Sequence, residues 1–152
     1  MRTPALILAV AMAVLLTGRA SSQDKANPPL KERTEESVKK VKELQKERIA
    51  TLRKASEVSL KLAQAARLEV WDAVEDRMSL LNAELEVAEK GSDRITLYTK
   101  AVDDLKAYEE LAKARFEAGR GTELAVHKAK AKRLGVEIQL ERAKIREAKE
   151  GK

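Results

Sequence analysis

A short glycine-containing stretch, residues 115–129, constrains the fold of this chain more than any other. It reads RFEAGRGTELAVHKA, and long polar segments with helical spacing lie on both sides of it. Gly119 follows the first segment, where glycine supplies the left-handed backbone that closes a helix. Thr122 precedes the next apolar run, where its side chain accepts from the free amides of a new helix. The stretch therefore predicts two helices joined by a tight turn, and so short a connection makes them antiparallel neighbours.

The composition favours the same architecture along the whole chain. Charged residues make up 37% of the sequence and aromatic residues only 3%, a mixture typical of long amphipathic helices. From Leu30 onward apolar residues recur every three or four positions, which is helical spacing. We expect an all-α, elongated fold of antiparallel helical hairpins with coiled-coil-like packing. The sequence contains no cysteine, which excludes disulfides and thiol chemistry.

An internal repeat indicates a second turn. The segment LNAEL at 81–85 aligns with LGVEI at 134–138, and at the same offset Ala66 aligns with Gly119. We interpret the first half of the chain as a degenerate hairpin whose turn, near Ala63–Arg67, has lost its glycine.

The alternative is one unbroken helix from Leu30 to Lys90, because no Gly or Pro interrupts this segment. We favour two hairpins. The next break is at Gly91, after which Ser92 or Asp93 is expected to cap a helix that begins at Arg94.

The beginning of the chain is typical of an exported protein. Arg2 precedes an apolar run from Ala5 to Leu16, and small residues follow up to a predicted cleavage site after Ala20. We therefore expect residues 1–20 to be a signal peptide, 21–29 a flexible lead-in and 30–150 the helical domain. No stretch of the mature chain is apolar and long enough to span a membrane, so we expect no transmembrane segment there. The predicted location is the periplasm or the outer membrane.

The residues around the turn also resemble the hairpin tip of the TolC family of outer-membrane efflux proteins. The resemblance covers only the family's helical hairpin portion, and it implies a two-hairpin TolC-like domain for residues 30–150. It further implies that the tip, Gly119, Arg120, Gly121 and Thr122, is a surface on which an adaptor protein of an export pump docks. The matching residues are Phe116, Gly119, Thr122, Leu124, Val126 and Ala129.

No group of residues is typical of an enzyme. Adjacent acids such as Glu35 and Glu36 point in different directions on a helix and are more typical of solvated faces. His127 is the only histidine, with Glu123 four residues before it, and we expect it to be a surface or seam residue. We therefore predict no catalytic, metal-binding or cofactor-binding residues and no enzymatic activity.

A basic cluster follows the turn, but we expect no nucleic-acid binding because the chain is predicted to be exported. Anionic envelope components, or water alone, are the remaining partners for these charges. The aromatic residues are expected to pack between helices. The basic residues are Lys128, Lys130, Lys132 and Arg133, and the aromatic ones are Trp71, Tyr98, Tyr108 and Phe116.

The predicted function is that of a non-enzymatic, TolC-like periplasmic helical protein linked to efflux or export. Its expected partners are an adaptor or other envelope proteins, or further copies of the chain. The alternative is a periplasmic chaperone-like or structural envelope protein.

Overall fold

The computed structural model describes residues 30–150, and in this part of the chain it contains four helices and no strand. The all-α prediction is confirmed for these residues. The predicted signal peptide (1–20) and lead-in (21–29) lie outside the described residues. In order, the helices are α1 (Leu30–Gln64), α2 (Val70–Val87), α3 (Gly91–Glu117) and α4 (Glu123–Glu150).

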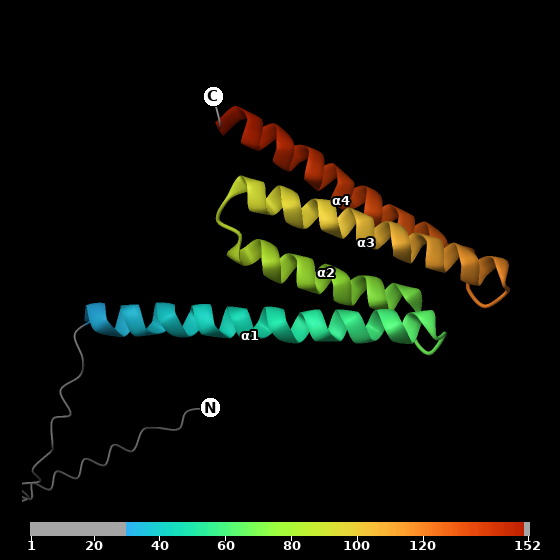
Figure 1. Cartoon of the computed structure of the whole chain (residues 1–152), viewed down its shortest axis with the longest axis horizontal. Coiled ribbons are helices and arrows are strands. Elements are labelled where there is room, and N and C mark those ends of the chain that lie inside the picture. Colours follow the sequence, from blue (N-terminus) through green and yellow to red (C-terminus); the bar gives the residue numbers. More distant parts are fainter. Residues whose placement is uncertain (1–29, 151–152) are drawn as a thin grey trace, which may run out of the picture.

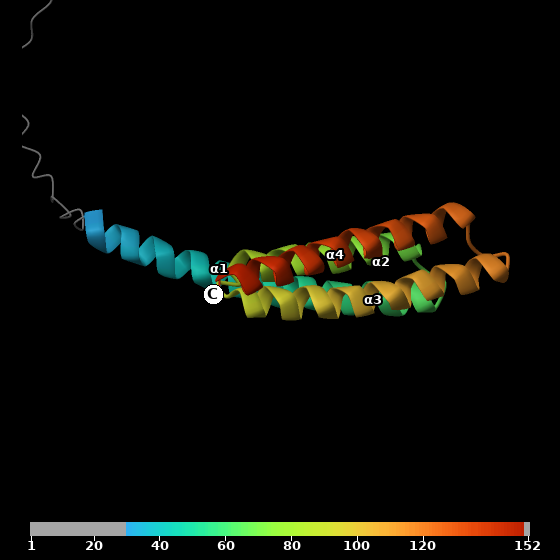
Figure 2. The ribbon, with the colours of Figure 1, turned by 90° about the horizontal axis from the view of Figure 1, so that it is seen from above.

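Consecutive helices run in opposite directions and lie side by side in chain order, with α1 and α4 at the outer edges of the view (Figure 1). The closest packing is between α3 and α4 and between α1 and α2, and α2 also packs on α3 and α4. The N-terminal half of α1 projects beyond the other helices (Figure 2). None of the four helices has an apolar stretch that would cross a membrane.

The interior between the helices is thin. Its largest fully buried side chains are Leu81, Leu105 and Val74. Many of the remaining buried positions are alanines, which allow helix backbones to approach closely but bury little apolar area each. These alanines are Ala63, Ala73, Ala83, Ala101, Ala112, Ala129 and Ala143.

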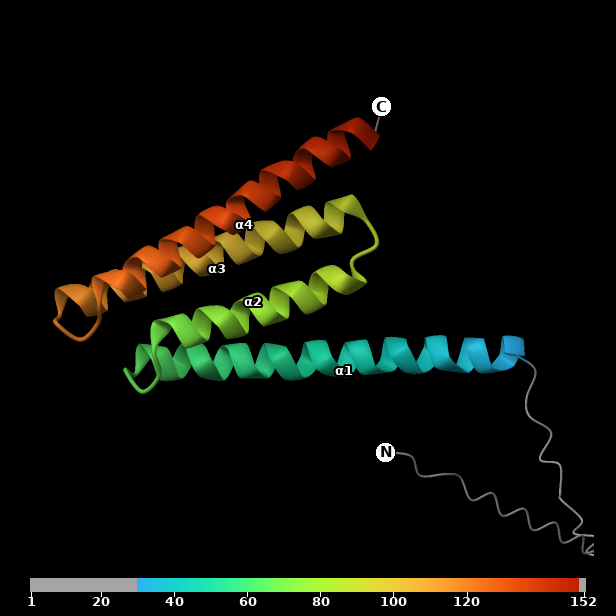
Figure 3. The same ribbon diagram turned by 180° about the vertical axis from the view of Figure 1, so that it is seen from behind.

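The chain reverses between α1 and α2 through a left-handed residue, Ala66, with φ of 56°. The Ala66 N–H donates to the Ala63 carbonyl at 3.0 Å, and the Arg67 N–H donates to the Leu62 carbonyl at 2.8 Å. This pair of bonds is the Schellman arrangement that usually ends in glycine. Residues 30–90 are therefore two helices rather than one, as Figure 3 shows from behind.

The turn between α3 and α4 has the same hydrogen bonds. The Gly119 N–H donates to the Phe116 carbonyl at 2.9 Å, and the Arg120 N–H donates to the Arg115 carbonyl at 2.8 Å. Gly119 has φ of 67°, close to that of Ala66. Ala66 thus occupies in the first turn the position that Gly119 occupies in the second, as the sequence repeat aligns them.

The predicted start of the third helix was wrong. α3 begins at Gly91 and not at Arg94, and its N-cap residue is Lys90, without a side-chain cap. Ser92 and Asp93 lie inside the first turn. There the Asp93 carboxylate faces the positive end of the helix dipole, which favours an acid at this position without making it a cap.

A glycine at position 66 should stabilise the protein. An L-residue in the left-handed region costs about 1 kcal/mol or more, and glycine does not carry this cost. We expect Ala66→Gly to raise the free energy of unfolding by about 0.5–1 kcal/mol, measured by urea denaturation. The matched control is Ala65→Gly, next to it in the same turn but with negative φ, which should be neutral or destabilising. Equal effects of the two substitutions would contradict this role of Ala66.

Candidate functional site

The predicted tip is a fixed turn with its backbone hydrogen-bonded on both sides. On the α3 side the bonds to Phe116 and Arg115 close the helix, as described above. On the α4 side the Ala125 N–H donates to Thr122 Oγ1 at 3.2 Å, so Thr122 caps α4 as the sequence predicts. Glycine is favoured at position 121 for a different reason from that at position 119. A Cβ at Gly121 would lie 3.1 Å from the Arg115 Cβ and 3.3 Å from the Phe116 nitrogen.

The tip presents polar and apolar groups to solvent. Gly119, Arg120 and Thr122 are exposed, and Gly121 is half-buried. Phe116, in the last turn of α3, is 45% exposed, and Leu124, in the first turn of α4, is 62% exposed. The prediction that Phe116 packs between helices was therefore wrong, because α3 and α4 extend past the first turn of α2 (Figure 1) and leave this side chain uncovered.

Arg115 connects the tip to the turn at the end of α1. Its Nη1 donates to the Leu68 carbonyl at 3.0 Å, and its Nη2 donates to the Ala63 carbonyl. The Ala63 carbonyl, which already accepts from the Ala66 N–H, thus gains a second donor from another helix. The Leu68 carbonyl lies in the connection between α1 and α2, and the same guanidinium holds it. The sequence offered no signal for this contact, because 47 residues separate Arg115 from Leu68.

Behind the tip, a buried ion pair joins α3 to α4. Arg133 Nε donates to Glu109 Oε2 at 2.7 Å, and Arg133 Nη1 donates to Glu137 Oε2 at 2.8 Å. The Glu109 side chain is only 7% exposed. The hydrogen bond from Arg133 outweighs the effect of burial and lowers the pKa of Glu109 below its ordinary value of 4.5.

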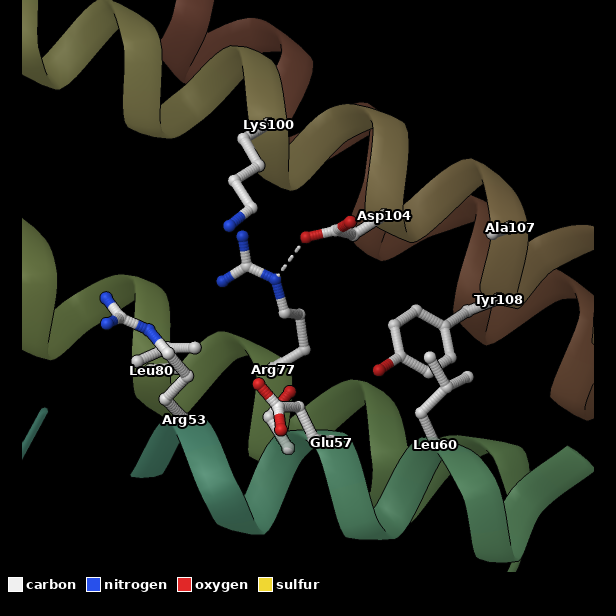
Figure 4. Close-up of a pocket in the computed structure, with 10 residues that line it drawn as sticks. Arg53, Glu57, Leu60, Arg77, Leu80, Lys100, Asp104, Ala107 and Tyr108 are labelled. Atoms are coloured by element: carbon white, nitrogen blue, oxygen red, sulfur yellow. Dashed lines mark hydrogen bonds and ion pairs between the residues drawn. The ribbon is translucent and has the colours of Figure 1, made fainter. Parts of the chain in front are cut away.

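A cavity of about 220 Å³ lies between α1, α2 and α3. Figure 4 shows Asp104 reaching from α3 to Arg77 on α2, where the Arg77 Nε to Asp104 Oδ2 distance is 2.6 Å. Nearby, Arg53 on α1 pairs with Glu84 on α2, also at 2.6 Å. The Arg77 side chain is buried, and its Nη1 has no partner among the described residues. We assign these pairs to helix packing, since each joins two helices and no nucleophile is paired with a base.

The basic residues after the tip take part in packing. The ammonium groups of Lys128 and Lys132 lie 5.2 Å and 5.5 Å from the centre of the Trp71 ring, within range of a cation–π interaction. They join α4 to α2 across the groove that Trp71 lines. Arg133 is held in the ion pairs described above, and Lys130 is exposed.

His127 is exposed, and its Nε2 lies 3.5 Å from Glu123 Oε1. Within residues 30–150, no group of His, Cys, Asp or Glu side chains is arranged to hold a metal ion.

A scan against protein-family models finds no match for this chain, and searches of curated proteins and of solved structures find none either. The interpretation of the tip therefore rests on its own residues and geometry.

Loss of the two hydrogen bonds from the Arg115 guanidinium should destabilise the fold. Arg115→Lys keeps the charge but cannot serve two carbonyls with a rigid fork, so we expect a loss of about 1–3 kcal/mol in the free energy of unfolding. The measurement is urea denaturation, with Arg120→Lys as the matched control in the adjacent exposed turn. A loss no larger than that of Arg120→Lys would show that the contact to Ala63 and Leu68 contributes nothing.

The Glu109–Arg133 pair should make stability depend on pH in the acidic range. The folded state lowers the pKa of Glu109, so the ionised carboxylate stabilises the fold above pH 4.5. This contribution is lost as the pH falls from 4.5 through the lower folded-state pKa. We expect Glu109→Gln to cost about 1–3 kcal/mol at pH 7 and progressively less below pH 4.5.

Thermal unfolding at a series of pH values tests this, with Glu110→Gln as the control on the exposed side of the same helix. The Glu110 side chain is 69% exposed and pairs with Lys113, an interaction of little net worth. A Glu109→Gln effect that stays constant from pH 7 to pH 3 would contradict the assignment.

Proposed function

We propose that this chain is a non-enzymatic, TolC-like helical protein of the cell envelope, linked to efflux or export, that acts by binding other proteins. In this proposal the pairs α1–α2 and α3–α4 are helical hairpins with coiled-coil-like packing. The tip, residues 119–122, docks an adaptor or another envelope protein in the periplasm or at the outer membrane. Further copies of the chain are the second class of partner.

The observation that carries the proposal is the pair of exposed apolar side chains flanking a fixed turn. Phe116 and Leu124 project at the two sides of the tip while the backbone between them is hydrogen-bonded. Aromatic anchors of this kind dominate the energy of many interfaces. Because the turn is already ordered, binding requires little further loss of conformational entropy.

The alternative function, a chaperone-like binding protein, is favoured by a different part of the molecule. In the projecting half of α1, Val38, Val41 and Leu44 are each at least 50% exposed. An apolar helix face of this kind fits transient contact with unfolded chains. The two functions differ in which end of the molecule meets the partner.

A crosslinker at the tip tests the proposal, because the chain has no cysteine and Arg120→Cys therefore carries a single attachment site. In intact cells we expect a photo-crosslinker at this site to capture a narrow set of proteins that includes an export adaptor. Adding Gly119→Ala and Gly121→Ala should weaken capture about tenfold. Alanine costs about 1–2 kcal/mol at the left-handed position 119, and at position 121 its Cβ crowds Arg115 and Phe116.

Two controls make the test specific. Gly135→Ala, on α4 away from the turn, adds a Cβ that meets no atom within 4 Å, and should leave capture unchanged. The same crosslinker at Glu89→Cys, between α2 and α3 at the opposite end, should miss the adaptor. Capture of the same broad set of unfolded proteins from both ends would overturn the docking function and favour the chaperone-like one.

A further inference from the structure

We propose that a second copy of this chain docks along α4, with its helix α1 packed antiparallel on a row of exposed residues. The inference deepens the self-association named in the proposed function, and it requires neither the tip nor an adaptor. The inference is carried by two rows of exposed side chains, one on α1 and one on α4, the helices at opposite edges of the fold. In one register the two rows match each other.

The first row, the edge row of α4, follows the alternating spacing of three and four residues that is typical of a coiled-coil seam. Each of its residues is exposed, and Ile138 and Ile145 are 53% and 55% exposed. The face that α4 packs inward is a different one, with Ala129, Val136 and Leu140 buried. The row consists of Leu124, His127, Ala131, Leu134, Ile138, Glu141, Ile145 and Ala148.

The second row, the edge row of α1, has the same spacing, and all of its residues are likewise exposed. Two of its apolar members, Leu44 and Val58, are each 55% exposed. The inward face of α1 is again separate, with Ser56, Ser59 and Ala63 buried. The row consists of Val41, Leu44, Arg48, Thr51, Ala55, Val58 and Leu62.

Charge within the rows selects the register. The edge row of α1 contains one charged residue, Arg48, and that of α4 contains one carboxylate, Glu141. A charge buried in a seam without a partner is strongly unfavourable, so a stable interface must place these two together. In an antiparallel pair this register also aligns Leu44 with Ile145. A shift by one heptad either way would leave both charges facing apolar residues.

Side-chain size fits the same register. In four of the six uncharged facing pairs a large side chain stands opposite a small one, an alternation that lets two helices approach closely. Leu44 with Ile145 and Leu62 with His127 instead join two large side chains. The facing pairs are Val41 with Ala148, Leu44 with Ile145, Thr51 with Ile138, Ala55 with Leu134, Val58 with Ala131 and Leu62 with His127.

Charges beside the seam are mostly complementary. In antiparallel pairing Glu47 lies beside Lys144, and Lys54 lies beside Glu137. Ion pairs of this kind, beside the seam, set partner choice and orientation in coiled coils. One pair, Lys61 with Lys130, is repulsive and lies at the end near the tip. Within one chain Arg48 pairs with Glu86 at 2.6 Å and Glu141 with Lys144 at 2.8 Å, and both are exposed pairs of little net worth that can rearrange. Glu137 also pairs with Arg133 at 2.8 Å and would accept from Lys54 in addition.

A second copy is the occupant that this geometry favours. In one chain α1 and α4 run in opposite directions and lie at opposite edges (Figure 1). Copies that point the same way therefore bring α4 of one beside α1 of the next in the required antiparallel sense. The row from Val41 to Leu62 is about 30 Å long at 1.5 Å per residue. Such a head-to-tail contact repeats around a closed ring when the rotation between copies closes.

Engineered cysteines test the register directly in this cysteine-free chain. Mild oxidation of Leu44→Cys/Ile145→Cys should give covalent dimers and larger species on a non-reducing gel. Each single variant lacks a facing cysteine and should remain one chain. The control pair Val58→Cys/Ile145→Cys uses the same rows out of register and should crosslink at least fivefold less. A double variant that stays monomeric, or that crosslinks no better than the control pair, would overturn the inference.

Charge reversal gives a second readout by light scattering over a range of concentrations. Arg48→Glu should raise the concentration at which copies associate about tenfold or more, and adding Glu141→Arg should restore association. The control Glu86→Gln removes the partner of Arg48 within one chain and should leave association unchanged. Monomers at every concentration, or no effect of Arg48→Glu, would overturn the inference.

Tip crosslinks from Arg120→Cys that persist in a monomeric chain would leave the proposed docking function standing.

Discussion

A left-handed residue at each of two turns is the constraint on which the rest of this structure depends. Ala66 and Gly119 each end a helix with the same pair of hydrogen bonds, and each sends the chain back along the helix it has just left. Arg115 then joins the two turns, because it belongs to the end of α3 and donates to the carbonyls of Ala63 and Leu68. The two turns, the second of which is the tip, thus form one connected end of the molecule.

The thin interior has a consequence for function. Alanine-lined contacts hold the helices close but leave much apolar surface uncovered, and this surface lies at the tip and along the outer helices. A helical segment that projects beyond its neighbours, such as the first half of α1, gains little stability from packing in one chain. The tip interaction and the pairing of outer helices proposed above would each cover a part of this surface.

Much of this organisation was predictable from local sequence. Gly119 and Thr122 identified the second turn because their residue types have specific roles at helix ends. Ala66 has no such signature, and only its alignment with Gly119 in the repeat located the first turn. The start of α3 was predicted wrongly because Ser92 and Asp93 suit a cap, whereas the first turn of a helix also tolerates them.

The contacts between distant residues were not predictable. Arg77 with Asp104, and Glu109 with Arg133, join helices whose rotation about their axes depends on the packing of the whole molecule. The exposure of Phe116 has the same origin, since it depends on where α2 begins relative to the end of α3. Helical periodicity identifies apolar rows but does not say which row meets a neighbour within the chain and which remains free.

Amide hydrogen exchange in α1, followed as a function of protein concentration, is the measurement that tests the account most directly. Residues 34–51 are almost entirely exposed in one chain, so their backbone should exchange rapidly in dilute solution. If a second copy covers the outer face of α1, protection of these amides should rise with concentration while that of the buried part of α3 stays constant. Protection of residues 34–51 that is independent of concentration would contradict the account.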